Sequence, residues 1–203
     1  SLAPSSASSS LMAQAYLELG FSHILQGWDH LLFLICLMAL ATMPRKIFLA
    51  VTGFTIGHSF TLAAASLNFL TLPVIYVETL ISLSIVLVCL ELLQSERKTL
   101  ARSYPVLISL FFGLVHGLGF ANELISIGFP EDGIFAALLF FNLGVEVGQI
   151  VFVIPVMLLV YAVQKFNGSA YNFYKNLGYK FIFYTIGIVA CYWFVERSMQ
   201  FSS

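Results

Sequence analysis

The chain has very few charged residues. Aspartate, glutamate, lysine and arginine make up 9% of its 203 residues, whereas hydrophobic residues make up 60%. A soluble domain usually carries about 25% charged residues, and so few charges cannot cover a surface that faces water. The composition therefore excludes an ordinary soluble protein and predicts that most of the surface faces lipid.

Several motifs are also missing. No basic cluster is large enough to bind nucleic acid, and no G-x4-G-K-[ST] segment could hold nucleotide phosphates. The H-E-x-x-H pattern of zinc proteases is absent. The cysteines Cys36, Cys89 and Cys191 lie in apolar runs without C-x-x-C spacing, which argues against a disulfide framework or a thiolate metal site. We expect no nucleic-acid partner and interpret the cysteines as packing residues.

Six apolar segments are long enough to cross a membrane, because about 20 residues span the hydrocarbon core. We therefore expect an all-α integral membrane bundle. Its helices should cover residues 22–42, 47–69, 73–94, 104–121, 134–164 and 179–195. The chain then divides into a polar linker with a candidate interfacial segment over 1–21, a transmembrane domain over 22–198, and a tail over 199–203.

Positive charge is confined to alternate loops. The loops after the first, third and fifth expected spans hold every lysine and arginine except Arg197. The positive-inside rule places such loops in the cytoplasm. Both termini should then lie on the outer, periplasmic side of a cell inner membrane, where an upstream periplasmic domain or a second copy of the chain could be a partner.

Glycines are spaced four residues apart in three of the expected spans. Glycine lets two helices approach until their backbones touch, which drives helix association in lipid. We therefore expect the second, fourth and fifth spans to be the inner helices. The pairs are Gly53 and Gly57, Gly113 and Gly117, and Gly144 and Gly148.

All four histidines of the chain fall inside expected spans. A strongly polar residue within the bilayer is costly unless it faces a cavity or a polar partner. At about 1.5 Å per residue, the histidines and several carboxyl groups reach one depth in the outer half of the membrane. They predict an outward-open polar cavity lined by His23, Asp29, His30, His58, Glu78, His116 and Glu146, with Ser82, Asn142 and Gln149 in supporting positions.

Imidazole and carboxylate groups together favour a divalent transition metal such as Ni²⁺, Co²⁺ or Zn²⁺. In a continuous helix, the seven-residue spacing of His23 and His30 separates them by about 10 Å along the axis. That separation favours two stations along a path. Gly27 lies between them, and a break there would allow a single site. Asp29 is then either a ligand or a group that orients a histidine.

A purely structural interpretation of the polar residues is also open. Glu78 and Glu146 could be buried, protonated carboxyl groups that tie helices together. Ser59, Thr61 and Ser82 are typical of hydroxyl groups that bond to their own helix.

Four segments of the chain resemble motifs of the HupE/UreJ family of nickel and cobalt permeases. The first resembles the H-x5-D-H signature of that family, and the others are similar to its HupE/UreJ-like branch, as is Glu78 followed by Ser82. The segments are HILQGWDHLLFL over 23–34, FTIGHSFTL over 54–62, HGLGFA over 116–121 and FNLGVEVGQ over 141–149.

The resemblance implies uptake of a transition metal, commonly nickel or cobalt, with His23, Asp29 and His30 handling the ion. One motif departs from the family pattern. Permeases of the family often carry a second signature, F-H-G-x-[AV]-H-G-x-E. The corresponding segment FFGLVHGLG over 111–119 keeps only the last histidine, His116, and has Gly119 in place of the glutamate.

Two functions remain open. The leading hypothesis is a permease, in which an ion entering from outside meets His23, Asp29 and His30 and then reaches the deeper histidines and Glu146. The rival is an intramembrane metal-dependent hydrolase, in which His30, His58 and His116 hold a zinc-like ion with an open position for water. In that case Glu146 or Glu78 would be the general base.

Overall fold

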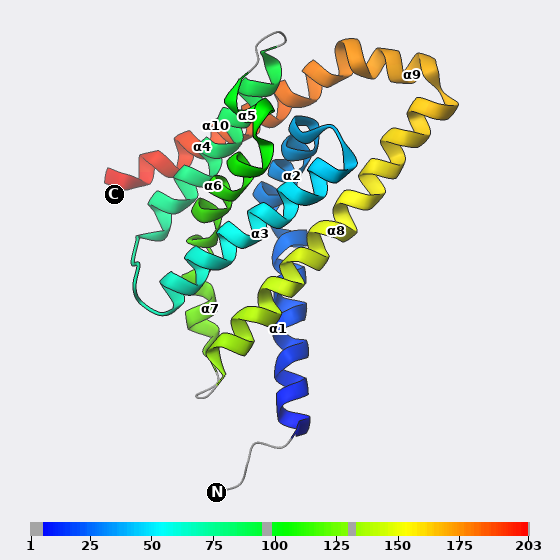
Figure 1. Cartoon of the computed structure of the whole chain (residues 1–203). Helices are drawn as coiled ribbons and strands as arrows, with labels where there is room; N and C mark the ends of the chain where they lie inside the picture. The colour runs from blue at the N-terminus through cyan, green and yellow to red at the C-terminus, as the bar shows by residue number, and fades with distance from the viewer. Residues whose placement is uncertain (1–5, 95–98, 130–132, 203) are drawn as a thin grey trace, which may run out of the picture.

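The computed structural model describes residues 6–94, 99–129 and 133–202, and each regular element within these ranges is helical (Figure 1). The all-α prediction is therefore confirmed for the described part of the chain. The helices are α1 (Ser6–Gln26), α2 (Trp28–Ala41), α3 (Pro44–Ser66), α4 (Val74–Leu93), α5 (Leu100–Ser103), α6 (Pro105–Gly117), α7 (Ala121–Ile127), α8 (Ile134–Phe166), α9 (Gly168–Phe173) and α10 (Tyr179–Met199), with a π-helical turn over Tyr174–Gly178 and a 3₁₀ turn over Gln200–Ser202.

The helices include three to five candidate membrane spans. Among the described residues, α3, α4 and α8 are each long and apolar enough to cross a membrane. The count rises to five if the bent pairs α1–α2 and α6–α7 each form one span. The expected sixth span coincides with α10, which is helical but is not among these candidates.

The expected first span is not one continuous helix. It is divided at Gly27, where α1 ends and α2 begins at an angle of 72°. Gly27 has φ −78° and ψ 98°, which is extended rather than helical, so the helical hydrogen-bond pattern stops there. A side chain at this position would press against the His30 ring, because a Cβ atom would lie 2.6 Å from its Nδ1 atom. The absence of a side chain at Gly27 therefore allows α2 to pack closely against the end of α1.

The fourth expected span is divided too. Helix α6 ends at Gly117, and a turn leads into the short helix α7 at an angle of 45°. Both breaks lie near histidines, since His23 and His30 flank the first and His116 precedes the second.

Glycines bring two helix pairs into backbone contact. A Cβ atom on Gly57 would overlap the carbonyl oxygen of Leu110, and one on Gly113 would overlap that of Phe54, so α3 and α6 touch directly. Helices α1 and α8 meet in the same way at Gly20 and Gly144. The predicted glycine contacts in the second, fourth and fifth spans are therefore confirmed, and Gly20 adds one that the four-residue spacing did not reveal.

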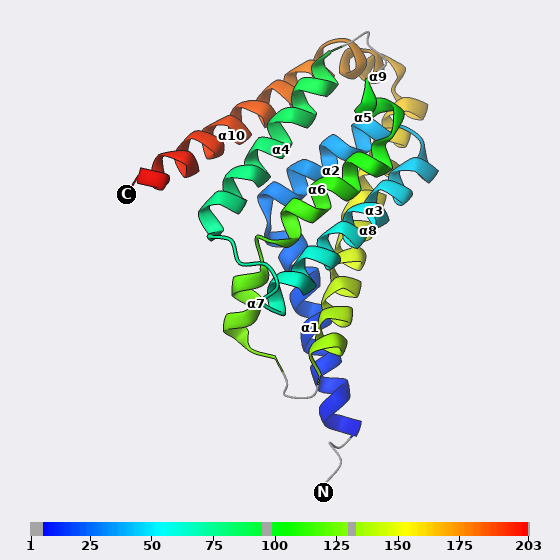
Figure 2. The ribbon, with the colours of Figure 1, turned by 60° about the vertical axis from the view of Figure 1, so that its left-hand side comes forward.

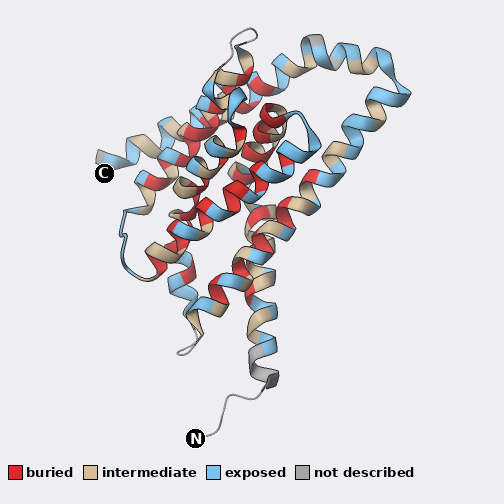
Figure 3. Ribbon diagram, in the orientation of Figure 1, coloured by how far each residue is buried: buried red, intermediate tan, exposed pale blue. Residues whose placement is uncertain are grey.

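Figure 2 shows α10 lying along α4 at the edge of the bundle, while α1 extends beyond it at the N-terminal end. Buried residues are concentrated where α2, α3 and α6 meet and along the first half of α8, whose second half is mostly exposed (Figure 3).

Cys36 and Cys89 are buried with their sulfur atoms 3.6 Å apart, whereas Cys191 is exposed. All three cysteines are free thiols.

Candidate metal centre

The break at Gly27 brings the two histidines of the first span together. His23 lies in the last turn of α1 and His30 in the first turn of α2. Their ring centroids are 4.5 Å apart, far less than the separation of about 10 Å that a straight helix would impose. The first span is therefore broken at Gly27, which places His23 and His30 in one site. They do not form two separate sites along a straight helix.

A third imidazole joins the pair from α3. The His58 ring centroid lies 5.9 Å from that of His23 and 6.4 Å from that of His30. One ring nitrogen from each of the three residues falls within 4.8 Å of the other two. Metal–nitrogen bonds of 2.0–2.1 Å hold two ligand nitrogens roughly 3 to 3.5 Å apart, so a pair of nitrogens at the 4.8 Å limit would need to approach by about 1.5 Å to share one ion. The donor set therefore suits a divalent transition metal.

The carboxylate of Asp29 lies against His30. Its Oδ1 atom is 3.0 Å from the His30 Nδ1 atom and accepts a hydrogen bond of 2.9 Å from the His30 backbone N–H. A carboxylate in this position fixes the orientation of the ring and leaves the other ring nitrogen for a ligand. Of the two roles expected for Asp29, the geometry matches the one in which it orients a histidine.

His116 stands next to the group of three. Its ring centroid is 5.3 Å from that of His30. Its Nε2 atom lies 3.1 Å from the Ser84 hydroxyl oxygen on α4, which leaves Nδ1 as the available nitrogen. His116 belongs to the histidine cluster in space, although only His23, His30 and His58 bring ligand atoms within mutual reach among the described residues.

The surroundings of the histidine cluster are aromatic. The His23 ring centroid lies 4.0 Å from that of Phe120, and the His58 ring stacks on Phe141 at 6.4 Å. The ring centroids of Phe33 and Phe54 lie 5.0 Å and 5.1 Å from that of His116. Electrostatic attraction between a cation and its ligands is stronger in such a medium than in water.

Burial leaves some imidazole nitrogens without protein partners. His58 and His116 are 0% and 1% exposed. Within the described part of the chain, no hydrogen bond reaches His23 Nε2 or His116 Nδ1, although both atoms are buried. A buried polar atom without a partner is costly and normally reflects a function or an unseen ligand. The two unpartnered nitrogens therefore indicate a binding site for a ligand that accepts imidazole nitrogen, such as a metal ion.

Glu78 lies outside the histidine cluster. Its carboxylate forms an ion pair with Arg197 of α10, with 3.5 Å between Oε2 and Nε, and Arg197 also donates a 2.8 Å hydrogen bond to the Glu78 carbonyl oxygen. Ser82 donates to carbonyl oxygens of its own helix, as do Ser59 and Thr61. The structural interpretation of these hydroxyl groups is therefore confirmed, and the expected place of Glu78 in the cavity is not.

The polar residues of α8 form a seam with α3 beside the histidine cluster. Asn142 donates a hydrogen bond to the Leu138 carbonyl oxygen. Thr52 donates a 2.7 Å hydrogen bond to Glu146, and Thr55 donates one of 2.8 Å to Gln149. Glu146 thus faces α3 rather than the three-histidine group.

Ser84, Thr52 and Thr55 could not be selected from the sequence. Hydroxyl groups are common in membrane helices, and nothing distinguished these from hydroxyls that bond to their own helix. Arg197 stood out as the one basic residue on the expected outer side. That position beside the outer end of the third span, where Glu78 lies, was a usable signal for the ion pair.

A comparison with protein families identifies the chain. The model of a family described as HupE / UreJ protein matches residues 3–197. Because the match covers nearly the whole sequence, the chain belongs to the HupE/UreJ family. No curated protein and no solved structure matched it.

Proposed function

We propose that this member of the HupE/UreJ family, a family associated with nickel and cobalt transport, moves a divalent transition-metal ion, nickel or cobalt, across the inner membrane. The observation that carries the proposal is the meeting of His23, His30 and His58, whose ring nitrogens lie within 4.8 Å of one another at a break in a membrane helix. Helix breaks of this kind form ion sites in transporters, because irregular backbone is tolerated in a membrane only where it lines a cavity.

In the proposed path, the ion arrives from the outer side and exchanges its water molecules for imidazole nitrogens. His23 and His30 meet it at the break, and His58 and His116 complete the surroundings. The negative charge of Asp29, 3.0 Å from His30, offsets part of the positive charge of the cargo. Six spans with both termini outside remain part of the proposal.

The seam between α3 and α8 is the proposed continuation of the path. In the proposed orientation α8 runs inward, so Asn142, Glu146 and Gln149 follow one another in that direction. One Glu146 oxygen accepts a hydrogen bond from Thr52 of α3, and the other is buried. Glu146 is therefore proposed as the next group to meet the ion, in place of a role in the first site.

A metal-dependent hydrolase is the weaker candidate. Three histidine nitrogens around one point are a donor set that catalytic zinc uses. The two carboxylates expected to act as general base lie elsewhere, since Glu78 pairs with Arg197 and Glu146 bonds to Thr52. The geometry therefore favours a metal ion that is transported over one that stays bound and catalyses a reaction.

The test is uptake of radioactive nickel or cobalt into vesicles that contain the purified protein. We expect saturable uptake in the unchanged protein and its loss in His30→Ala. Loss of a ligand should weaken cobalt binding by more than the roughly 10- to 100-fold typical of losing a group that only orients a ligand. Uptake that persists unchanged in His30→Ala would contradict the proposal.

The matched control is Ser109→Ala. Ser109 is also fully buried, and it donates a hydrogen bond to the Ala50 carbonyl oxygen away from the histidines. Its variant should keep uptake, which separates loss of a ligand from general damage to the bundle. Tightly held, non-exchanging zinc without any flux would instead favour the hydrolase.

A further inference from the structure

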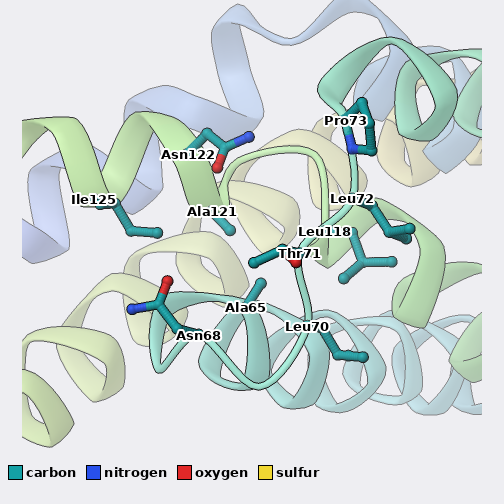
Figure 4. Close-up of a pocket in the computed structure, with 10 residues that line it drawn as sticks. All are labelled: Ala65, Asn68, Leu70, Thr71, Leu72, Pro73, Leu118, Ala121, Asn122 and Ile125. Carbon is teal, nitrogen blue, oxygen red and sulfur yellow. The ribbon is translucent and has the colours of Figure 1, made fainter.

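A pocket of about 400 Å³ lies between the turn after α6 and the loop that joins α3 to α4. Figure 4 shows its walls, with Asn122 and Ile125 from α7 facing the segment that carries Asn68 and Thr71. These four residues are exposed. The positive-inside rule puts both loops on the outer side of the membrane, so the pocket opens where the cargo would arrive.

One residue connects the pocket with the histidine cluster. Leu118 and Ala121 line the pocket, and Phe120 lies between them in the sequence. The Phe120 side chain is 9% exposed. Its ring centroid lies 4.0 Å from that of His23 and 5.2 Å from that of Phe141, on which it stacks at 14°. Phe120 thus directly precedes a residue that lines the pocket, and its ring packs against His23.

We propose that this pocket is the entrance vestibule for a hydrated divalent cation and that the Phe120 ring is the barrier between the vestibule and the histidine cluster. The proposal rests on the proposed function, because it presupposes that the histidines bind the ion. It adds a second station, and it gives Phe120 a role beside the ionisable residues of the site.

The chemistry of the two compartments differs as such a path requires. The vestibule offers neutral amide and hydroxyl groups from Asn68, Asn122 and Thr71, which can bond to the water shell of an ion without stripping it. Beyond Phe120 the side chains are imidazoles and phenyl rings, which replace that shell. A barrier between them keeps water from reaching the inner site.

The position of Phe120 suits a moving part. It is the residue immediately before α7, at the 45° bend between α6 and α7. Short elements that flank a bend are those that swing when a site opens. A small rotation about this turn would withdraw the ring from His23 while leaving α6 packed against α3.

The first test measures how fast Co²⁺ alone enters and leaves the purified full-length protein, by its visible absorption in stopped flow. We expect Phe120→Ala to raise both rates by about tenfold, since a gate changes access without changing the bound state. The affinity should stay within about twofold, as both rates change together. Phe120→Leu, which keeps an apolar side chain, should fall between Phe120→Ala and the unchanged protein and also guards against misfolding.

Phe111→Ala is the matched control, because Phe111 lies on α6 with its side chain 57% exposed. Its rates should equal those of the unchanged protein. Unchanged rates in both Phe120 variants would overturn the gate while leaving the proposed function intact. An unchanged protein that binds no Co²⁺ would overturn the proposed function and, with it, the gate.

The second test blocks the vestibule. In a Cys191→Ser background, a charged methanethiosulfonate reagent would be attached to Thr71→Cys, and Co²⁺ entry measured again. Labelling should slow entry by about tenfold without changing the affinity. Ser126→Cys, exposed on α7 but outside the pocket lining, is the control and should be unaffected. Equal effects at the two positions, or none at either, would overturn the vestibule.

Discussion

The carboxylate of Asp29 has a specific task at the residue scale. It holds His30 by its side chain and by the backbone N–H, so it sets the direction in which the second nitrogen of that ring points. Its charge also acts on any cation bound beside it. Replacing Asp29 with asparagine keeps the shape of the side chain and removes its charge.

We predict that Asp29→Asn weakens Co²⁺ binding by roughly 10- to 100-fold, the usual effect of losing a group that orients a metal ligand. The measurement is a titration followed by absorption. Glu18→Gln is the control, since Glu18 is an exposed acid on α1 that interacts with Gln14. If the two variants lose the same affinity, the effect is one of net charge and the assigned role of Asp29 is wrong.

The histidines could be identified from the sequence because an imidazole within a membrane span is uncommon and costly, and there were few other polar groups for it to meet. The residues that contact the histidines and carboxylates could not be identified from the sequence. The contact of Glu78 with Arg197 and that of His116 with Ser84 join distant parts of the chain. Which carboxylate faces which helix depends on rotation about each helix axis, and the hydropathy of a span does not fix that rotation.

At the scale of elements, the break at Gly27 is the feature that builds the site. A Cβ atom at this position would lie 2.6 Å from His30 Nδ1 and 3.2 Å from the Asp29 carboxylate. The residue must therefore stay small for the two half-helices to bring His23 and His30 together.

We predict that Gly27→Ala lowers Co²⁺ affinity by about tenfold or more, because the methyl group displaces the pair that orients the ligand. The fold should persist, since φ −78° is open to alanine. Circular dichroism would check the fold and titration the affinity. A variant with unchanged affinity would show that the ring position is not set by this glycine.

Gly113 lies where α3 and α6 are in backbone contact. Gly113→Ala should destabilise the protein by about 1–3 kcal/mol, as in other overpacked interiors, because its methyl group would enter the Phe54 carbonyl oxygen. Gly187→Ala on α10 is the control, since its Cβ atom would make only an ordinary 3.5 Å contact with Cys89. Thermal unfolding in detergent compares them, and similar melting temperatures would contradict the backbone contact.

The elements themselves could be predicted only in part. Hydropathy identified helical segments because lipid demands long apolar runs. It could not separate a straight span from a bent one, since α1 with α2, and α6 with α7, are continuous in composition. Gly27 was recognised as a possible break because two histidines seven residues apart needed one to share an ion. No pair of candidate ligands with such a spacing flanks the turn at Leu118 and Gly119, so that bend could not be predicted.

At the scale of the whole molecule, the number of spans decides on which side the chain ends. In the proposed orientation, the C-terminus returns to the outer side if α10 crosses the membrane and stays inside if α10 lies along the surface. The distribution of lysine and arginine favours the first arrangement.

We predict that alkaline phosphatase fused after Ser203 is active in a bacterial inner membrane, because that enzyme matures only outside the cytoplasm. A fusion after Phe166, at the end of α8, should be inactive. Activity at neither position, with both fusions produced in equal amounts, would mean that α10 does not cross and that the bundle has five spans.

The bend in the first span has one more consequence, which concerns peptide groups rather than side chains. A helix carries a dipole with a partial positive charge at its amide end and a partial negative charge at its carbonyl end. At Gly27 the carbonyl end of α1 and the amide end of α2 meet beside the histidines. The first attracts a cation and the second repels it, and Asp29 in the first turn of α2 neutralises the repelling end. The backbone thus supplies an attraction for positive charge that side-chain replacement alone would not remove.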